Sequence, residues 1–358
     1  MQAPERLERA KELLDGGRPA QALSLLKAPV PPIFRPERDY LRAECLRGQG
    51  YFLRAAALYR RLLSRSSAAD PAMKVESCLS LASVLRSLGE VVRARRVWRR
   101  GHGIVRAGKL AGYDERFALE DALIDRALGR YGQSLGKLAP LLSLFRRQGD
   151  RSAEGFVLWA MGGARRFSGD LAGSEKDFRA SLSAFERAED ETGRAYALFG
   201  LGGVTRMRGD FKASRASYAR AGRHLEGTQD VFGRAYAHCG LANALRQVGD
   251  FSRARAHYLL SHKLYRSLDD KVDLAYVDWG LGKVAIQTGK LAEAESRLRR
   301  ALEAFKRYRE QRGLVLSEGT LACVLHARGK TAEAEGLFAR SLRRARAAGL
   351  HAHLEIFT

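Results

Sequence analysis

Arginine recurs at one position of a long internal repeat. The series consists of Arg47, Arg86, Arg126, Arg166, Arg206 and Arg246, at intervals of 39 or 40 residues. It stops in the last two repeats, where Ile286 and His326 occupy the same position. A guanidinium group pairs bidentately with the oxygens of a carboxylate or a phosphate. The spacing therefore predicts a row of side chains that bind an anionic partner.

Aromatic residues follow the same period in the middle of the chain. One row consists of Phe156, Tyr196, Tyr236 and Tyr276, and a second row, one helical turn further along, consists of Trp159, Phe199 and Trp279. Rings beside guanidinium groups add contact area for an extended segment. We take the arginines from Arg86 to Arg246, both aromatic rows and Asn243 as the candidate partner-binding residues.

A structural role is the alternative for both sets of residues. Arginine near a helix C-terminus is favourable by about 0.3–1 kcal/mol without any ligand, because it interacts with the helix dipole and the terminal carbonyls. Repeated tyrosine and phenylalanine residues can also pack against the next repeat. Both interpretations stay open for the arginines, and packing is the favoured one for the aromatic rows.

Glycines mark the turns of the repeat that carries these residues. After Gly17 and Gly50 they recur at a strict interval of 40 residues, at Gly89, Gly129, Gly169, Gly209, Gly249, Gly289 and Gly329. A glycine that ends one helix and begins a tight turn suits the left-handed backbone at this place. The pattern around each glycine predicts a helix, a turn and a second helix.

The second helix of each hairpin has a fixed spacing of its own. A small residue falls five positions after the glycine, at Ala22, Ala55, Ala94, Ser134, Ser174, Ser214, Ala254, Ala294 and Ala334. A large residue falls nine positions after it, at Leu26, Tyr59, Trp98, Leu138, Phe178, Tyr218, Tyr258, Leu298 and Phe338. A spacing of four places both on one helical face. Aspartates at 150, 190, 230 and 270 are expected to cap the first helix.

These residues resemble the tetratricopeptide repeat over about residues 5–345, with Leu201-Gly202 and Leu281-Gly282 in the first helix and the small-then-large pair in the second. The 40-residue period resembles the longer variety found in LGN/Pins scaffolds, kinesin light chains and bacterial Rap-type regulators. The sequence departs from the ordinary repeat in lacking the proline that closes each unit. The resemblance implies an all-α, right-handed α-solenoid of about nine hairpins, whose arginine and aromatic positions face a concave groove.

Four prolines between Pro29 and Pro36 interrupt the array. We therefore expect a divergent N-terminal helical hairpin over residues 1–28 that acts as a cap, and a Pro-rich linker over 29–36. An eight-repeat superhelix then follows over 37–347, and a C-terminal tail over 348–358.

Composition and charge limit the class of protein. The chain of 358 residues carries a net charge of +23, from 63 basic and 40 acidic residues, which favours anionic partners. Its four cysteines lie far apart, which argues against a disulfide framework or a Cys-rich zinc site. No apolar stretch approaches the length of a membrane span, and the N-terminus has no apolar signal region. We expect a cytoplasmic protein that does not insert into membranes.

No residue pattern predicts catalysis, a cofactor or a metal site. Gly280-Leu281-Gly282-Lys283 looks like a phosphate-binding loop, but it lies inside a predicted helix rather than at a strand-to-helix junction. The eight histidines are scattered, and no Ser-His-Asp or Cys-His grouping has a catalytic spacing. The densest basic run, Arg93–Arg106, is either a solvated face or an anion-binding patch for nucleic acid or acidic protein.

Together these observations favour a non-catalytic scaffold or adaptor that binds an acidic peptide or protein segment in an arginine- and aromatic-lined groove. A helical-repeat protein that binds nucleic acid, RNA above all, through its basic faces is one alternative. A regulatory repeat subunit of a signalling system is another.

Overall fold

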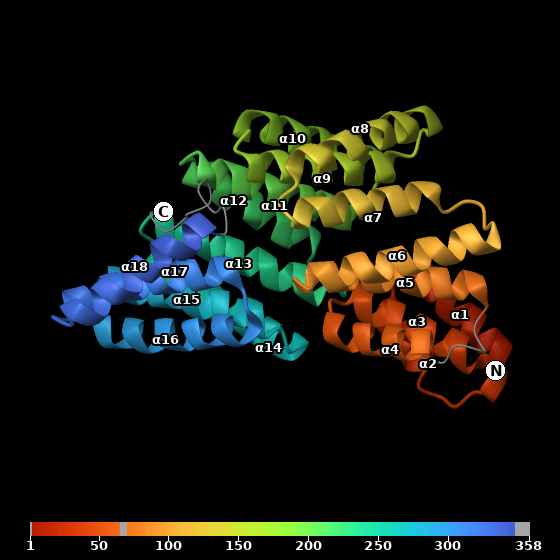
Figure 1. Cartoon of the computed structure of the whole chain (residues 1–358), viewed down its shortest axis with the longest axis horizontal. Helices are drawn as coiled ribbons and strands as arrows, with labels where there is room; N and C mark the ends of the chain where they lie inside the picture. The colour runs from red at the N-terminus through yellow and green to blue at the C-terminus, as the bar shows by residue number, and fades with distance from the viewer. Residues whose placement is uncertain (1, 65–69, 348–358) are drawn as a thin grey trace. The chain divides into compact units, whose positions relative to one another are not determined.

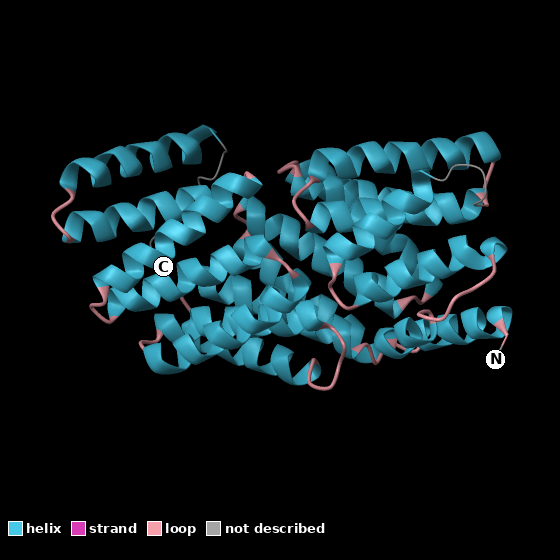
Figure 2. Cartoon of the chain, turned by 90° about the horizontal axis from the view of Figure 1, so that it is seen from below, coloured by secondary structure: helices cyan, strands magenta, loops and turns pink. Residues whose placement is uncertain are grey.

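The computed structural model describes residues 2–64 and 70–347 of the chain. Within these ranges the secondary structure consists of helices joined by short turns, with no strand (Figure 2). Consecutive helices along the chain pack against each other as helical hairpins (Figure 1). We call the odd-numbered helix of each hairpin its A helix and the even-numbered one its B helix. The predicted all-α solenoid of about nine hairpins is confirmed.

The chain divides into two compact units. Unit 1 comprises Met1–Ala164 together with Gly227–Phe232, and unit 2 comprises Arg165–Glu226 together with Gly233–Thr358. The sequence pattern did not predict this division, because the 40-residue period runs through it unchanged.

The helices up to the division have the following bounds: α1 Ala3–Asp15, α2 Pro19–Leu25, α3 Arg35–Gly48, α4 Phe52–Ser64, α5 Pro71–Ser87, α6 Val91–Gly108, α7 Asp114–Ala127, α8 Tyr131–Gln148 and α9 Arg151–Ser168. A short 3-10 helix, η1, covers Pro32–Phe34, and α3 begins directly after it. The segment 29–36, predicted as a linker, therefore contains helical residues.

The remaining helices are α10 Leu171–Arg187, α11 Glu191–Met207, α12 Phe211–His224, α13 Val231–Gln247, α14 Phe251–Leu268, α15 Lys271–Gln287, α16 Leu291–Tyr308, α17 Gln311–Ala327 and α18 Thr331–Ala347. The predicted C-terminal tail, residues 348–358, lies outside the described residues.

Glycine and aspartate set the ends of the helices. Every turn glycine predicted from the spacing has a positive φ, between 68° and 94°, which an L side chain rarely adopts. Aspartate side chains then cap the next helix by accepting a hydrogen bond from the amide three residues on. Asp150, Asp190 and Asp270 cap A helices in this way, and Asp170, Asp210 and Asp250 cap B helices.

The small and large residues of the B helices fill the space between hairpins, as the spacing predicts. The small positions Ala55 and Ala254 are fully buried, and so are the large positions Tyr59 and Tyr258. Separate apolar clusters form in the two units, one around α3–α6 and one around α15–α18. Phe338 in α18 is the exception, with 46% of its surface exposed, because no described hairpin follows it.

Candidate functional site

The first two arginines of the predicted row are paired with carboxylates of unit 1. Arg47 donates from Nε and Nη2 to Oε2 of Glu44, at 3.0 and 2.5 Å, and Glu44 also accepts from Tyr59 and Ser80. Burial alone would raise the pKa of Glu44, but Arg47 and these hydrogen bonds lower it below its ordinary value. The positive charge of Arg47 is therefore largely matched within the fold.

Arg86 makes an even more enclosed pair with the next A helix. Its Nε and Nη2 atoms donate to the two oxygens of Glu120 in α7, at 2.9 and 3.2 Å, as a guanidinium–carboxylate fork. The two side chains are only 13% and 9% exposed. Arg86 therefore links α5 to α7 through this ion pair, and little of its charge is available to a partner.

Arg126 in α7 packs against α9, still within unit 1. Its guanidinium lies over the ring of Trp159, 4.8 Å from the centroid, and Nη1 donates to the carbonyl oxygen of Ala160 at 3.4 Å. A β-carbon at Gly163 would lie only 2.7 Å from that Nη1 atom. A glycine in the next A helix therefore makes room for the arginine.

Arg166 in α9 repeats this arrangement within unit 2. A β-carbon at Gly203 of α11 would collide with its guanidinium, which also lies 4.8 Å from the ring centroid of Phe167. The side chain is half-buried, and its Nε atom has no hydrogen-bond partner. Among the described residues Arg166 pairs with no carboxylate, in contrast to Arg47 and Arg86 at the same register.

The last two arginines of the row differ in their exposure. Arg206 is half-buried, whereas Arg246 is only 2% exposed. Contrary to the prediction, Arg246 therefore does not lie on a surface. Arg246 lies close to Tyr258, whose pKa is raised by burial and lowered in part by Arg246. The hydroxyl of Tyr258 donates to Oδ1 of Asn243 at 2.8 Å, and Asn243 donates in turn to the carbonyl of Cys239.

The aromatic rows are divided between packing and surface. Phe199 and Trp279 are each 5% exposed, so these two candidate residues are not available to a partner in this structure. The ring of Phe199 packs on Tyr236 with centroids 4.9 Å apart, and Nε1 of Trp279 donates to Oγ1 of Thr320 at 3.0 Å. Both contacts join successive A helices, which is the structural alternative that the sequence left open.

The other aromatic candidates keep part of their surface exposed. Phe156 is 36% exposed and lies beside the half-buried Trp159 in unit 1. In unit 2, Tyr196, Tyr236 and Tyr276 are half-buried. Burial raises the pKa of the Tyr276 hydroxyl. Two groups of partly exposed candidates therefore remain, one in each unit.

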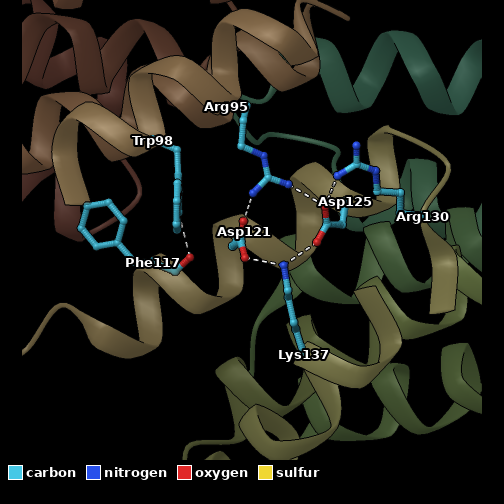
Figure 3. A network of polar contacts seen from close by, with 7 residues as sticks. All are labelled: Arg95, Trp98, Phe117, Asp121, Asp125, Arg130 and Lys137. Carbon is cyan, nitrogen blue, oxygen red and sulfur yellow. Dashed lines mark hydrogen bonds and ion pairs between the residues drawn. The ribbon is translucent and has the colours of Figure 1, made fainter. Parts of the chain in front are cut away.

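Within the basic run Arg93–Arg106, Arg95 forms ion pairs with carboxylates of the same chain (Figure 3). Arg95 in α6 pairs with Asp121 and, at 2.5 Å, with Asp125 of α7. Lys137 of α8 reaches both carboxylates, and Arg130 lies 3.7 Å from Asp125. The side chain of Asp125 is only 2% exposed. The network thus joins three helices of unit 1 and reduces the charge that this face offers to nucleic acid.

A cluster of carboxyl groups at the start of α15 was predicted only in part, since the sequence indicated Asp270 as a cap. Burial raises the pKa of Asp273 well above its ordinary value, and the neighbouring Asp270 raises it further. The charge of Glu310, the cap of α17, also raises the pKa of Asp273.

No group of three or more His, Cys, Asp or Glu side chains that could hold a metal ion occurs within the described ranges. None of the described helices is long and apolar enough to cross a membrane.

The hairpins α13–α18 match a known family. Residues 233–307 and 273–347 each match the model described as tetratricopeptide repeat (TPR). This part of the chain, residues 233–347, is therefore built from TPR-like repeats. No curated protein matches its sequence.

Solved structures share the TPR-like fold at low sequence identity. A Rap protein complexed with Competence and Sporulation Factor has a TM-score of 0.70 at 10% identity, over 97% of this chain and 98% of that chain. The apo form of RapI has a TM-score of 0.58 at 12% identity, over 76% and 98%. BtubC (BKLC) from P. vanneervenii has a TM-score of 0.51 at 19% identity, over 62% and 93%. At these identities the likeness concerns the fold.

Proposed function

We propose that this TPR-like chain is a non-catalytic interaction scaffold that binds an acidic peptide or protein segment on the A-helix face of unit 2. The observation that carries the proposal is the state of Arg166. Its guanidinium is half-buried without a carboxylate partner among the described residues, whereas Arg47 and Arg86 have theirs. A partly buried cation is stabilised by an anion, and an acidic partner would supply one.

Other partly exposed residues of unit 2 suit an extended acidic segment. Tyr196 and Tyr236 belong to the same unit and keep part of their surface exposed, as does Arg206. Guanidinium forks bind carboxylates, and the rings offer stacking area at low entropic cost. The net charge of +23 favours the encounter with such a partner.

The test is binding of a short fluorescein-labelled peptide that alternates glutamate with leucine, measured by fluorescence anisotropy. We expect the variant Arg166→Met/Arg206→Met to weaken binding about tenfold or more, because it removes two charge-assisted contacts. The same peptide with glutamine in place of glutamate should bind poorly to the unaltered chain. Circular dichroism should show that helix content is unchanged in the variant.

A matched control separates a local effect from one of net charge. Arg215 and Arg220 are exposed on the B helix α12, and Arg215→Met/Arg220→Met changes the net charge by the same amount. This control should bind the acidic peptide like the unaltered chain. Equal affinity of both double variants would contradict the proposal, and tight binding of an RNA oligonucleotide instead of the peptide would favour the nucleic-acid alternative.

A regulatory chain of a signalling system is a second candidate. It is favoured by the likeness to the Rap protein structure, which extends over 97% of this chain. A regulatory role would require that the acidic peptide alters the binding of a second protein. Binding of the peptide with no effect on any second partner would leave the scaffold role alone.

A further inference from the structure

A cavity of about 220 Å³ opens between α14, α15 and α16 in unit 2. Its apolar wall is formed by Leu281, Val284 and Ala285 of α15, all of them buried. Its rim carries Arg255 of α14 and Lys290 at the start of α16. These three helices are consecutive in the chain, and α15 packs against both α14 and α16 (Figure 1).

The cavity coincides with a departure from the repeat pattern. Ala285 stands where the repeats on either side have Leu245 and Leu325, both fully buried. An alanine in place of a leucine leaves space that the neighbouring side chains fill only in part. The volume is therefore built by the sequence at this hairpin, and a leucine at the same register fits in two other hairpins of the chain.

The charge of the rim departs from the pattern as well. Lys290 stands where the three preceding B helices begin with the caps Asp170, Asp210 and Asp250. Glu293, the acidic residue that lines the cavity, accepts a hydrogen bond from Arg297 at 3.0 Å and lies 3.7 Å from Arg255, so its charge is matched. An aspartate has thus been replaced by a cation beside an apolar cavity, which leaves the rim with a net positive charge.

We propose that this cavity receives one bulky apolar side chain of a partner segment, with an adjacent carboxylate bound by Lys290. This proposal rests on the proposed function, because the apolar side chain would belong to the same acidic segment and would anchor that segment in the cavity. A cavity of about 150 Å³ lined by apolar side chains accommodates a benzene ring, so 220 Å³ is enough for a phenylalanine or leucine side chain. It is smaller than the roughly 300 Å³ or more of ordinary small-molecule sites.

The test uses fluorine NMR with a probe that contains only the anchor and the acid. The probe is N-acetyl-para-fluorophenylalanyl-glutamate amide, and its matched control has glutamine in place of glutamate. The unaltered chain should bind the glutamate probe several-fold more tightly than the glutamine probe. Ala285→Leu fills the cavity and should weaken binding of both probes about tenfold or more, while Ala285→Ser, which keeps the cavity open, should bind them like the unaltered chain.

Two charge variants test the rim. Lys290→Asp restores the residue of the preceding B helices and should reduce the affinity for the glutamate probe to that for the glutamine probe. Lys263→Asp makes the same change of charge at an exposed position of α14, at least two helical turns away from Phe251–Arg255, and should have no effect. Because Lys290→Asp leaves the apolar wall intact, it remains informative if the leucine variant folds poorly.

The outcomes separate this proposal from the proposed function. If the acidic peptide binds through Arg166 but Ala285→Leu binds the fluorinated probes as the unaltered chain does, the cavity is a packing defect and the anchor proposal is overturned. Equal affinity for the glutamate and glutamine probes, or no binding of either, also overturns it. The opposite result is also informative. If the probes bind as described but the Arg166→Met/Arg206→Met variant binds the acidic peptide as the unaltered chain does, the anchor proposal is supported and the proposed binding through Arg166 and Arg206 is contradicted.

Discussion

The guanidinium of Arg166 in α9 occupies the space that a β-carbon at Gly203 in α11 would need. Arg126 and Gly163 have the same relationship one repeat earlier, within unit 1. The arginine position and the glycine position of the next A helix are thus two halves of one contact. An arginine row that looks like a free anion-binding surface in the sequence is, in the structure, also part of the packing between A helices.

The first prediction compares two glycines of α11. A β-carbon at Gly200 would overlap the ring of Phe178, which is 2% exposed and has little room to move. Gly200→Ala should therefore lower the free energy of unfolding by about 1–3 kcal/mol. Gly203→Ala should cost little, because the flexible end of Arg166 can move and alanine gains up to about 1 kcal/mol of helix propensity. Urea denaturation measures the free energy of unfolding of both variants. An equal loss in the two would contradict the prediction that the glycine is required at position 200 but not at position 203.

The second prediction concerns the enclosed pair of Arg86 and Glu120. Arg86→Leu leaves the carboxylate of Glu120 buried without its cation and should lower the free energy of unfolding by about 3–5 kcal/mol. Arg86→Leu/Glu120→Leu removes both charges and should regain most of that loss. Denaturant unfolding of both variants and of Glu120→Leu gives the coupling energy. Additive losses would show that the two side chains do not interact.

The third prediction uses the missing cap of α16. Lys290 makes no side-chain capping hydrogen bond, whereas Asp250 accepts one from the amide of Arg253 at 3.2 Å. Lys290→Asp should raise the free energy of unfolding by about 1 kcal/mol, because it adds an acceptor at a helix N-terminus. The same variant is expected to bind the glutamate probe more weakly, so stability and binding should change in opposite directions. A loss of stability would show that the lysine supports the fold.

The fourth prediction is a pH dependence from His238 and His257, whose Nδ1 atoms lie 3.0 Å apart. Burial lowers the pKa of both imidazoles, and for His238 the charges of His257 and Arg234 lower it further. The unfolded chain then binds more protons than the folded chain once the pH falls to the ordinary imidazole pKa of about 6.5. This contribution to stability is therefore present at higher pH and is lost as the pH falls through that value.

The measurement for this prediction is the free energy of unfolding at about pH 7.5 and about pH 5.5, on either side of the ordinary imidazole pKa. The decrease should be smaller in His238→Gln than in the unaltered chain. His326→Gln, at an exposed position of α17, is the control and should keep the full decrease. Comparing variants also removes the effect of Asp270 and Asp273, whose raised pKa values act in the opposite direction. An identical decrease in His238→Gln would contradict the prediction.

The sequence by itself determined the helices, their turns and the buried positions of the hairpins. These features depend on contacts within a few residues, such as the positive φ of Gly209 or the cap at Asp210, and on a period that repeats them. The register that places Ala254 and Tyr258 on one face of α14 is local as well. A repeat pattern is therefore sufficient to predict the fold.

Only the tertiary structure decided which repeated residues are free to bind. Glu120 lies 34 residues from Arg86, and no local rule of the sequence indicates that the two side chains neutralise each other. Phe199 and Trp279 were candidate partner-binding residues for which packing was the favoured role, and contacts with the next A helix bury both. The cavity beside Ala285 follows from one small residue among larger neighbours, and its volume depends on how three helices pack around it. Burial and charge pairing are properties of helices brought together in space, so the same residue type at the same register has different surroundings in different repeats.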